Sequence, residues 1–143
     1  MNVLTLTLFV YTAATLAMCG VIWFVQIVHY PLFQRVGTSG FSEYEVSHER
    51  LTSFVVMPLM LIEAGTAIGL TVWLSTRPLV WWGLALLLVI WVSTFAVQAP
   101  QHKRLEGGFD AVAHRLLIRT NWLRTIAWSV RGAIALGLLR GAI

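Results

Sequence analysis

Residues 51–74 read LTSFVVMPLMLIEAGTAIGLTVWL, an apolar run slightly longer than the roughly 20 residues that a membrane-spanning helix needs. One acidic residue, Glu63, interrupts the run near its middle. A charged side chain at that depth costs about 3 kcal/mol on insertion scales, so such residues usually face the protein interior and find a partner there. The stretch therefore predicts a membrane helix that turns one polar side chain inward.

Three further apolar runs occupy residues 3–28, 79–98 and 120–139. The 143 residues are 58% hydrophobic and only 11% charged, with a mean hydropathy of +0.78, which excludes an ordinary soluble domain. Hydrocarbon offers the backbone no hydrogen-bond partner, and the runs lack the alternation of barrel strands, so all four should be helical. The sequence predicts one all-α domain over residues 1–143, a polytopic membrane protein whose four transmembrane helices form an up-down bundle.

The basic residues are concentrated in the two loops that follow the first and third runs. By the positive-inside rule, both large loops should face the cytoplasm and both termini should lie outside. The expected location of this multi-pass protein is a bacterial inner (cytoplasmic) membrane, which is what the family resemblance given below implies. Because the charges gather in loops, the sequence pI near 10.0 does not indicate nucleic acid as a partner. The cytoplasmic group is Arg35, Arg50, Lys103, Arg104, Arg115, Arg119 and Arg124, against Arg77 and Arg140 on the other side.

Prolines and capping residues mark the expected helix ends. His29-Tyr30-Pro31 should end the first helix, and Pro100 should break the chain after the third run. Ser42-Glu43-Tyr44-Glu45 has the form of a capping box, so the second helix should begin there, ahead of the lipid. Pro58 should kink that helix, and Asp110 should cap the last one.

Two smaller features bear on packing and redox chemistry. Gly65 and Gly69 form a G-x-x-x-G, which predicts close helix packing within the bundle or between protomers, with packing inside the bundle favoured. Cys19 is the single cysteine, so an internal disulfide or a C-x-x-C redox pair is excluded.

Polar residues fall on one face of each run at helical spacing. At 1.5 Å per residue, Glu63 lies about 18 Å from Leu51, and Arg131 lies about 15 Å from Asn121, so their depths agree. We therefore expect an ion pair between Glu63 and Arg131. It could clamp two helices together or bind an anionic or carbonyl group of a ligand, and Glu63 could instead move a proton.

All four histidines lie at the expected cytoplasmic ends of their helices. They could hydrogen-bond loops and lipid headgroups, hold a metal or haem, or do acid–base work on a substrate. Glu45-x-x-His48 places a carboxylate and an imidazole on one helical face, as some metal sites do. The sequence carries no flavin or nicotinamide motif. The candidate metal ligands are His48, His102 and His114.

Three short motifs carry a family resemblance: His29-Tyr30-Pro31, Pro100-Gln101-His102-Lys103-Arg104-Leu105 and Trp128-Ser129-Val130-Arg131. Together they resemble the small four-helix bacterial membrane proteins grouped with the anthrone oxygenases, most of which have no assigned activity. The resemblance implies a hydrophobic aromatic substrate that molecular oxygen oxidises, often without an identified cofactor. A fainter likeness, through Trp23-Phe24 and His29, points to the haem-pathway membrane oxidases that convert protoporphyrinogen.

The leading functional hypothesis is an integral membrane oxidoreductase or oxygenase-like protein that acts on a lipophilic aromatic or quinone-like molecule. Arg131 would anchor a substrate oxygen, Glu63 would set its protonation, and His29, His102 or His114 would be the base. The expected substrate-binding residues are Gln26, Trp91, Gln98, Asn121, Arg124 and Trp128.

Other functions stay open at this point. The chain could be a non-enzymatic accessory subunit or a small transporter with a structural Glu–Arg pair, or a haem-binding membrane oxidase. Its partners would be the lipid bilayer, a lipophilic small molecule and either further copies of itself or a larger membrane complex.

Overall fold

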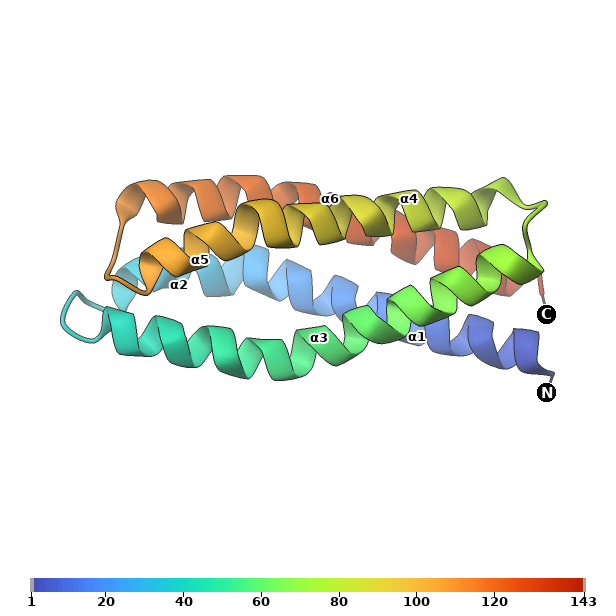
Figure 1. The fold of residues 1–143 in the computed structure, drawn as a ribbon, viewed down its shortest axis with the longest axis horizontal. Coiled ribbons are helices and arrows are strands. Elements are labelled where there is room, and N and C mark those ends of the chain that lie inside the picture. Colours follow the sequence, from blue (N-terminus) through green and yellow to red (C-terminus); the bar gives the residue numbers. More distant parts are fainter. Residues whose placement is uncertain (1, 143) are drawn as a thin grey trace.

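The computed structural model describes residues 2–142, and all regular structure in that range is helical. Four long rods lie side by side, and the two ends of the chain lie at the same end of the molecule (Figure 1). The rod from α1 packs against α3 and α6, and α4 packs against the same two helices. The first rod comprises α1 (Val3–Phe24), η1 (Val25–His29), α2 (Tyr30–Leu32) and η2 (Phe33–Arg35); the others are α3 (Phe41–Trp73), α4–η3–α5 (Pro78–Ser93, Thr94–Gln98, Ala99–Leu105) and α6 (Ala111–Arg140).

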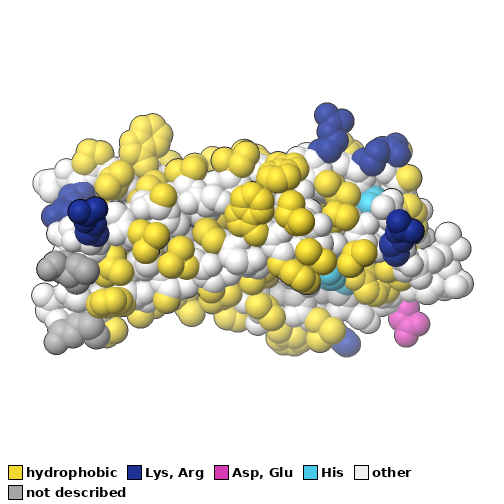
Figure 2. Space-filling model, turned by 180° about the vertical axis from the view of Figure 1, so that it is seen from behind, with side chains coloured by type: hydrophobic (Ala, Val, Ile, Leu, Met, Phe, Trp, Pro, Cys, Tyr) yellow, Lys and Arg dark blue, Asp and Glu magenta, His cyan; other side chains and the backbone are white. Residues whose placement is uncertain are grey.

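Three of these rods, over Val3–Arg35, Phe41–Trp73 and Pro78–Leu105, are long and apolar enough to cross a membrane. Figure 2 shows hydrophobic side chains over the middle of one face and the Lys and Arg side chains near the two ends. The fourth rod, α6, has the length but carries several arginines. A membrane-like helical bundle is therefore evident, whereas the crossing of the membrane by α6 stays a prediction.

The first and third rods each contain a π-helical turn just before a proline. Tyr30 N–H donates to the Val25 carbonyl, and Ala99 N–H donates to the Thr94 carbonyl, both five residues back. A proline ring clashes with the carbonyl four residues before it in a regular α-helix, and the wider turn gives the ring room. The helices therefore continue to Arg35 and Leu105, and the expected breaks at Pro31 and Pro100 are wrong.

The two loops at the histidine end differ in how their helices begin. Asp110 caps α6 as expected, because its Oδ1 accepts from the N–H groups of Val112 and Ala113 at 2.7 and 3.2 Å. The expected capping box is wrong: α3 begins at Phe41, and the Ser42 hydroxyl donates to the Glu106 carbonyl of the other loop. Pro58 lies inside α3, whose ribbon bends near its middle (Figure 1).

The Asp110 cap should make the thermal stability of the protein depend on pH. Its two backbone donors lower the pKa of the carboxyl group from the ordinary value of 3.8, so the charged cap stabilises the fold above that value and is lost as pH falls through the folded pKa. Asp110→Ala should lower Tm slightly at pH 7, and the difference from wild type should shrink below about pH 4. Asp110→Asn, which keeps an acceptor, should retain most of the stability. A Tm difference that stays constant down to pH 3 would contradict this explanation.

Close helix packing occurs at glycines other than the expected pair. A Cβ on Gly65 would meet no atom within 4 Å, and one on Gly69 would meet only Trp73, in its own helix. The expectation that this pair packs within the bundle is therefore wrong, and a role between protomers stays a prediction. Tight contacts lie instead on α1: a Cβ on Gly132 of α6 would be 3.1 Å from Cys19 Sγ, and one on Gly83 of α4 would be 3.0 Å from the Tyr11 hydroxyl.

Candidate functional site

The expected contact between Glu63 and Arg131 is confirmed. Arg131 Nη1 lies 2.9 Å from Glu63 Oε1, and both side chains are 0% exposed. Trp128 Nε1–H donates to the other carboxylate oxygen at 3.0 Å, and the guanidinium lies over the Tyr11 ring. Arg131 Nη1 and Glu63 Oε1 are close enough to form an ion pair. Neither atom makes a hydrogen bond within residues 2–142, so the contact is electrostatic. The pair joins α3 to α6 inside the bundle.

A second polar contact joins the first rod to α6. Asn121 Nδ2–H donates to Gln26 Oε1 at 2.9 Å, and Gln26 Nε2–H donates to the Ile118 carbonyl at 3.3 Å. Both side chains are buried. Both polar atoms of the Gln26 side chain are therefore hydrogen-bonded within the bundle, whereas Asn121 Oδ1 has no partner within residues 2–142.

The histidines gather at one end of the bundle, around Phe33. His29 Nε2 and His48 Nδ1 share a hydrogen bond of 2.8 Å, and the His48 and His102 rings lie 5.5 Å apart. His114 Nε2–H donates to the Tyr30 carbonyl at 2.7 Å. Of the expected metal ligands, His48 and His102 therefore lie together, while the Nε2 of His114 is engaged by the backbone.

A buried chain of three side chains links the first three rods. The Glu45 carboxylate contacts His102 Nδ1 at 2.5 Å, and the Tyr30 hydroxyl contacts His102 Nε2 at 2.9 Å. All three residues are buried. Sequence reasoning missed Glu45 and Tyr30 as site residues, although both stand in motifs that it singled out, because His48 and not His102 was the obvious helical neighbour of Glu45.

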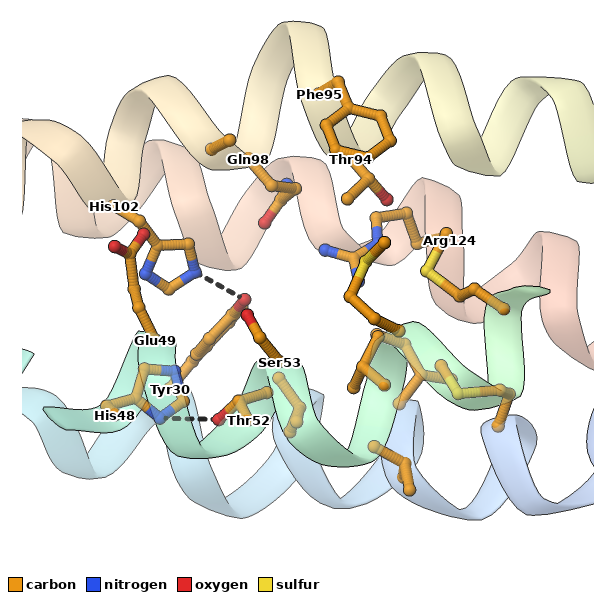
Figure 3. A pocket seen from close by; sticks show the side chains of 18 residues that line it. Tyr30, His48, Glu49, Thr52, Ser53, Thr94, Phe95, Gln98, His102 and Arg124 are labelled. Carbon is orange, nitrogen blue, oxygen red and sulfur yellow. Dashed lines mark hydrogen bonds between the residues drawn. The ribbon is translucent and has the colours of Figure 1, made fainter. Parts of the chain in front are cut away.

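Next to this chain lies a cavity of about 180 Å³ between the rods (Figure 3). Gln98 from η3 and Arg124 from α6 extend into it, opposite Tyr30 and His48. The rest of its wall is largely apolar, and it is formed by Met18, Val21, Ile22, Val25, Val56, Met57, Met60, Phe95 and Ala99, with Glu49, Thr52, Ser53, Thr94 and His102 as further polar residues.

Two polar atoms at this cavity have no partner. Arg124 is 7% exposed, and its Nε has no hydrogen-bond partner within residues 2–142. The same holds for Gln98 Oε1, although Gln98 Nε2–H donates to Thr120 Oγ1 at 2.7 Å. A buried polar atom without a partner is uncommon and marks a place where a ligand could supply one.

The expected substrate-binding residues divide into two groups. Gln98 and Arg124 line the cavity, whereas Gln26, Asn121 and Trp128 do not. Trp91 lies with Ala64, Leu84, Leu87 and Leu88 along a separate groove between α3 and α4. Of the expected catalytic residues, His102 lines the cavity, and His29, Glu63, His114 and Arg131 lie outside its wall.

A second, outer pocket of about 480 Å³ lies between the first rod and α3. His29, Tyr44 and Ser47 line it together with apolar side chains such as Phe24 and Leu51. It shares part of its wall with the inner cavity, so the two spaces are neighbours. The shared residues are Val21, Val25, His48, Thr52 and Val56.

Comparisons of the chain with protein families, with curated proteins and with solved structures found no match.

Proposed function

We propose that this protein is an integral membrane enzyme of the oxidoreductase or oxygenase type, and that it binds a lipophilic aromatic or quinone-like molecule in the inner cavity. The observation that carries the proposal is the composition of the cavity wall. Apolar side chains surround most of it, and the unpaired polar atoms of Arg124 and Gln98 lie on one side. Ligand sites commonly have this combination of an apolar wall and a few convergent polar groups.

Arg124 takes the anchoring role that sequence reasoning gave to Arg131. Arg131 is fully buried against Glu63 and does not line the cavity. The Arg124 guanidinium lies over the Trp128 ring, 5.4 Å from its centre, which fixes its position while Nε stays unpaired. A carbonyl or phenolate oxygen of the substrate would accept the hydrogen bond from Arg124.

The outer pocket is the proposed access route from the lipid. A lipophilic substrate dissolves in the bilayer, and the outer pocket lies between α3 and the first rod, two of the apolar helices. His48 and Thr52 belong to the wall between the two spaces and hydrogen-bond each other at 3.1 Å. Movement of these two side chains would connect the outer pocket with the cavity.

The proposal includes four membrane crossings in a bacterial inner membrane, with the histidine end in the cytoplasm and both termini outside. Arg124 and Arg131 of α6 are buried in the bundle, which supports its crossing because lipid-facing charges are avoided. The exposed Arg115 and Arg119 precede them at the histidine end, in agreement with the positive-inside rule.

The reaction follows from the resemblance to the anthrone oxygenases. In its balanced form, the CH₂ group of an anthrone and one O₂ give a C=O group and one water molecule, so dioxygen is the oxidant. Tyr30, held by His102, and Arg124 would both contact the substrate oxygen and position the ring in the apolar part of the cavity. Proximity and orientation of this kind lower the barrier without any further protein chemistry.

Arg124→Gln tests the proposal. With anthrone in detergent micelles, we expect wild-type protein to consume oxygen and to form anthraquinone, followed by its absorbance. Loss of a charge-assisted hydrogen bond of about 1.5–3 kcal/mol should lower kcat/KM about 10- to 100-fold. Arg119→Gln, an exposed position on the same helix, is the matched control and should behave as wild type. Absent turnover in wild type, or equal turnover in Arg124→Gln, would overturn the proposal.

A further inference from the structure

We propose that Glu45, Glu49 and His102 bind one divalent transition-metal ion at the polar end of the cavity. Each of the three residues offers one ligand atom, and these atoms all lie within 4.8 Å of one another. Glu49 and His102 also line the cavity, so an ion bound there would be reachable from the substrate space.

Glu45 gives a second, independent indication of a bound cation, beyond the closeness of the three side chains. Its side chain is 0% exposed, and while one carboxylate oxygen contacts His102, Oε2 has no hydrogen-bond partner within residues 2–142. A buried carboxylate normally has both oxygens satisfied by donors or by a cation. The orphaned oxygen therefore points to a missing positive partner.

The charges around the site agree with this need. Within residues 2–142, the ion pairs of Lys and Arg are Lys103 with Glu106 and Arg131 with Glu63, so no lysine or arginine neutralises Glu45 or Glu49. The basic group that contacts Glu45 is His102, itself one of the proposed ligands. Two carboxylates held close together repel each other. A divalent cation would cancel both charges at once.

The backbone places the three ligands in a suitable arrangement. Glu45 and Glu49 are four residues apart in α3 and therefore share a helical face, and His102 reaches them from α5. His102 Nδ1 faces Glu45, and Nε2 faces the Tyr30 hydroxyl. With the ion on Nδ1, Nε2–H would donate to Tyr30, and such an outer partner orients most metal-binding histidines.

The ligand types narrow the choice of ion. Two carboxylates and one imidazole suit manganese, iron, cobalt or zinc in the divalent state, and three protein ligands leave positions for water or substrate. The proposal deepens the proposed function by naming a cofactor class for it. Binding of the ion itself is independent of the substrate and can be tested alone.

The test measures metal binding by the purified full-length chain. The protein is stripped with a chelator and titrated with Co²⁺, Mn²⁺ and Zn²⁺, followed by cobalt absorbance, manganese electron paramagnetic resonance and elemental analysis. We expect one ion per wild-type chain and at least a tenfold weaker affinity in Glu49→Gln and His102→Gln. Glu43→Gln, an exposed acid in the same helix, is the matched control and should bind as wild type.

Glu49→Gln keeps the test decisive if the fully buried positions fail to fold, because Glu49 is only half-buried. Absence of binding in wild type, or unchanged binding in both Glu49→Gln and His102→Gln, would overturn the metal site. Metal binding without anthrone turnover would overturn the proposed function alone. Turnover by metal-free protein would leave the binding site in place and would overturn only the role of the ion as a cofactor of that reaction.

Discussion

Arg131→Leu should lower the free energy of unfolding by about 3–5 kcal/mol, the largest single effect that we expect in this protein. The substitution leaves the Glu63 carboxylate fully buried with Trp128 Nε1 as its remaining hydrogen-bond donor. A buried charge without its counter-charge is costly because nothing replaces the lost water. Chemical or thermal unfolding in detergent or bicelles measures the change.

A double-mutant cycle separates the ion pair from the packing of its side chains. Glu63→Leu combined with Arg131→Leu should cost much less than the sum of the two single substitutions, since no unpaired charge is left. Arg140→Leu, an exposed arginine of the same helix, is the control and should change stability little. Additive single costs would show that Glu63 and Arg131 do not interact.

Gly132→Leu is the second large effect that we expect. A Cβ at this position would lie 3.1 Å from Cys19 Sγ and 3.4 Å from Leu16 Cδ2, both on α1, and the remaining leucine atoms need still more room. Overpacking of this kind costs about 1–3 kcal/mol and sometimes more. The substitution should therefore lower Tm markedly by forcing α1 and α6 apart.

The chain offers a matched control and a rescue for this prediction. Gly137 is also in α6, but a Cβ there would meet no atom within 4 Å, so Gly137→Leu should be neutral or slightly stabilising. Gly132→Ala should cost less in a Cys19→Ala background, where the nearest atom is gone. An equal cost in both backgrounds would rule out the Cys19 contact as the cause.

The sequence was enough to predict how far along its helix each polar residue lies. It predicted only in part which residue of another helix each of them contacts. Glu63 and Arg131 could be paired because a rise of 1.5 Å per residue gave them matching depths, and the structure has them in contact. Glu45 was instead matched with His48, because the two are three residues apart and share a face of one helix. His102 became the partner instead, from a rod whose π turn no hydropathy pattern reveals.

The choice between Arg124 and Arg131 as the ligand anchor illustrates the same limit. Both arginines lie on the polar face of α6, seven residues apart, and the sequence favoured Arg131 because its depth matches that of Glu63. Only the packed structure shows that Arg131 is paired with Glu63 and that Arg124 Nε, beside the cavity, has no partner within residues 2–142. Which of the two arginines pairs with Glu63 is decided by how the helices pack in the assembled bundle.

Because of the π turns η1 and η3, the direction in which side chains point from the first and third rods depends on the exact number of residues in each rod, and not only on its overall length. Each such turn adds one residue to a helix, so every later side chain is rotated by about 100° relative to an uninterrupted helix. Deleting one residue within 94–98 would leave hydropathy and span length almost unchanged, yet it would swing His102 away from Glu45. These two short segments should therefore tolerate exchange of one apolar side chain for another far better than any insertion or deletion.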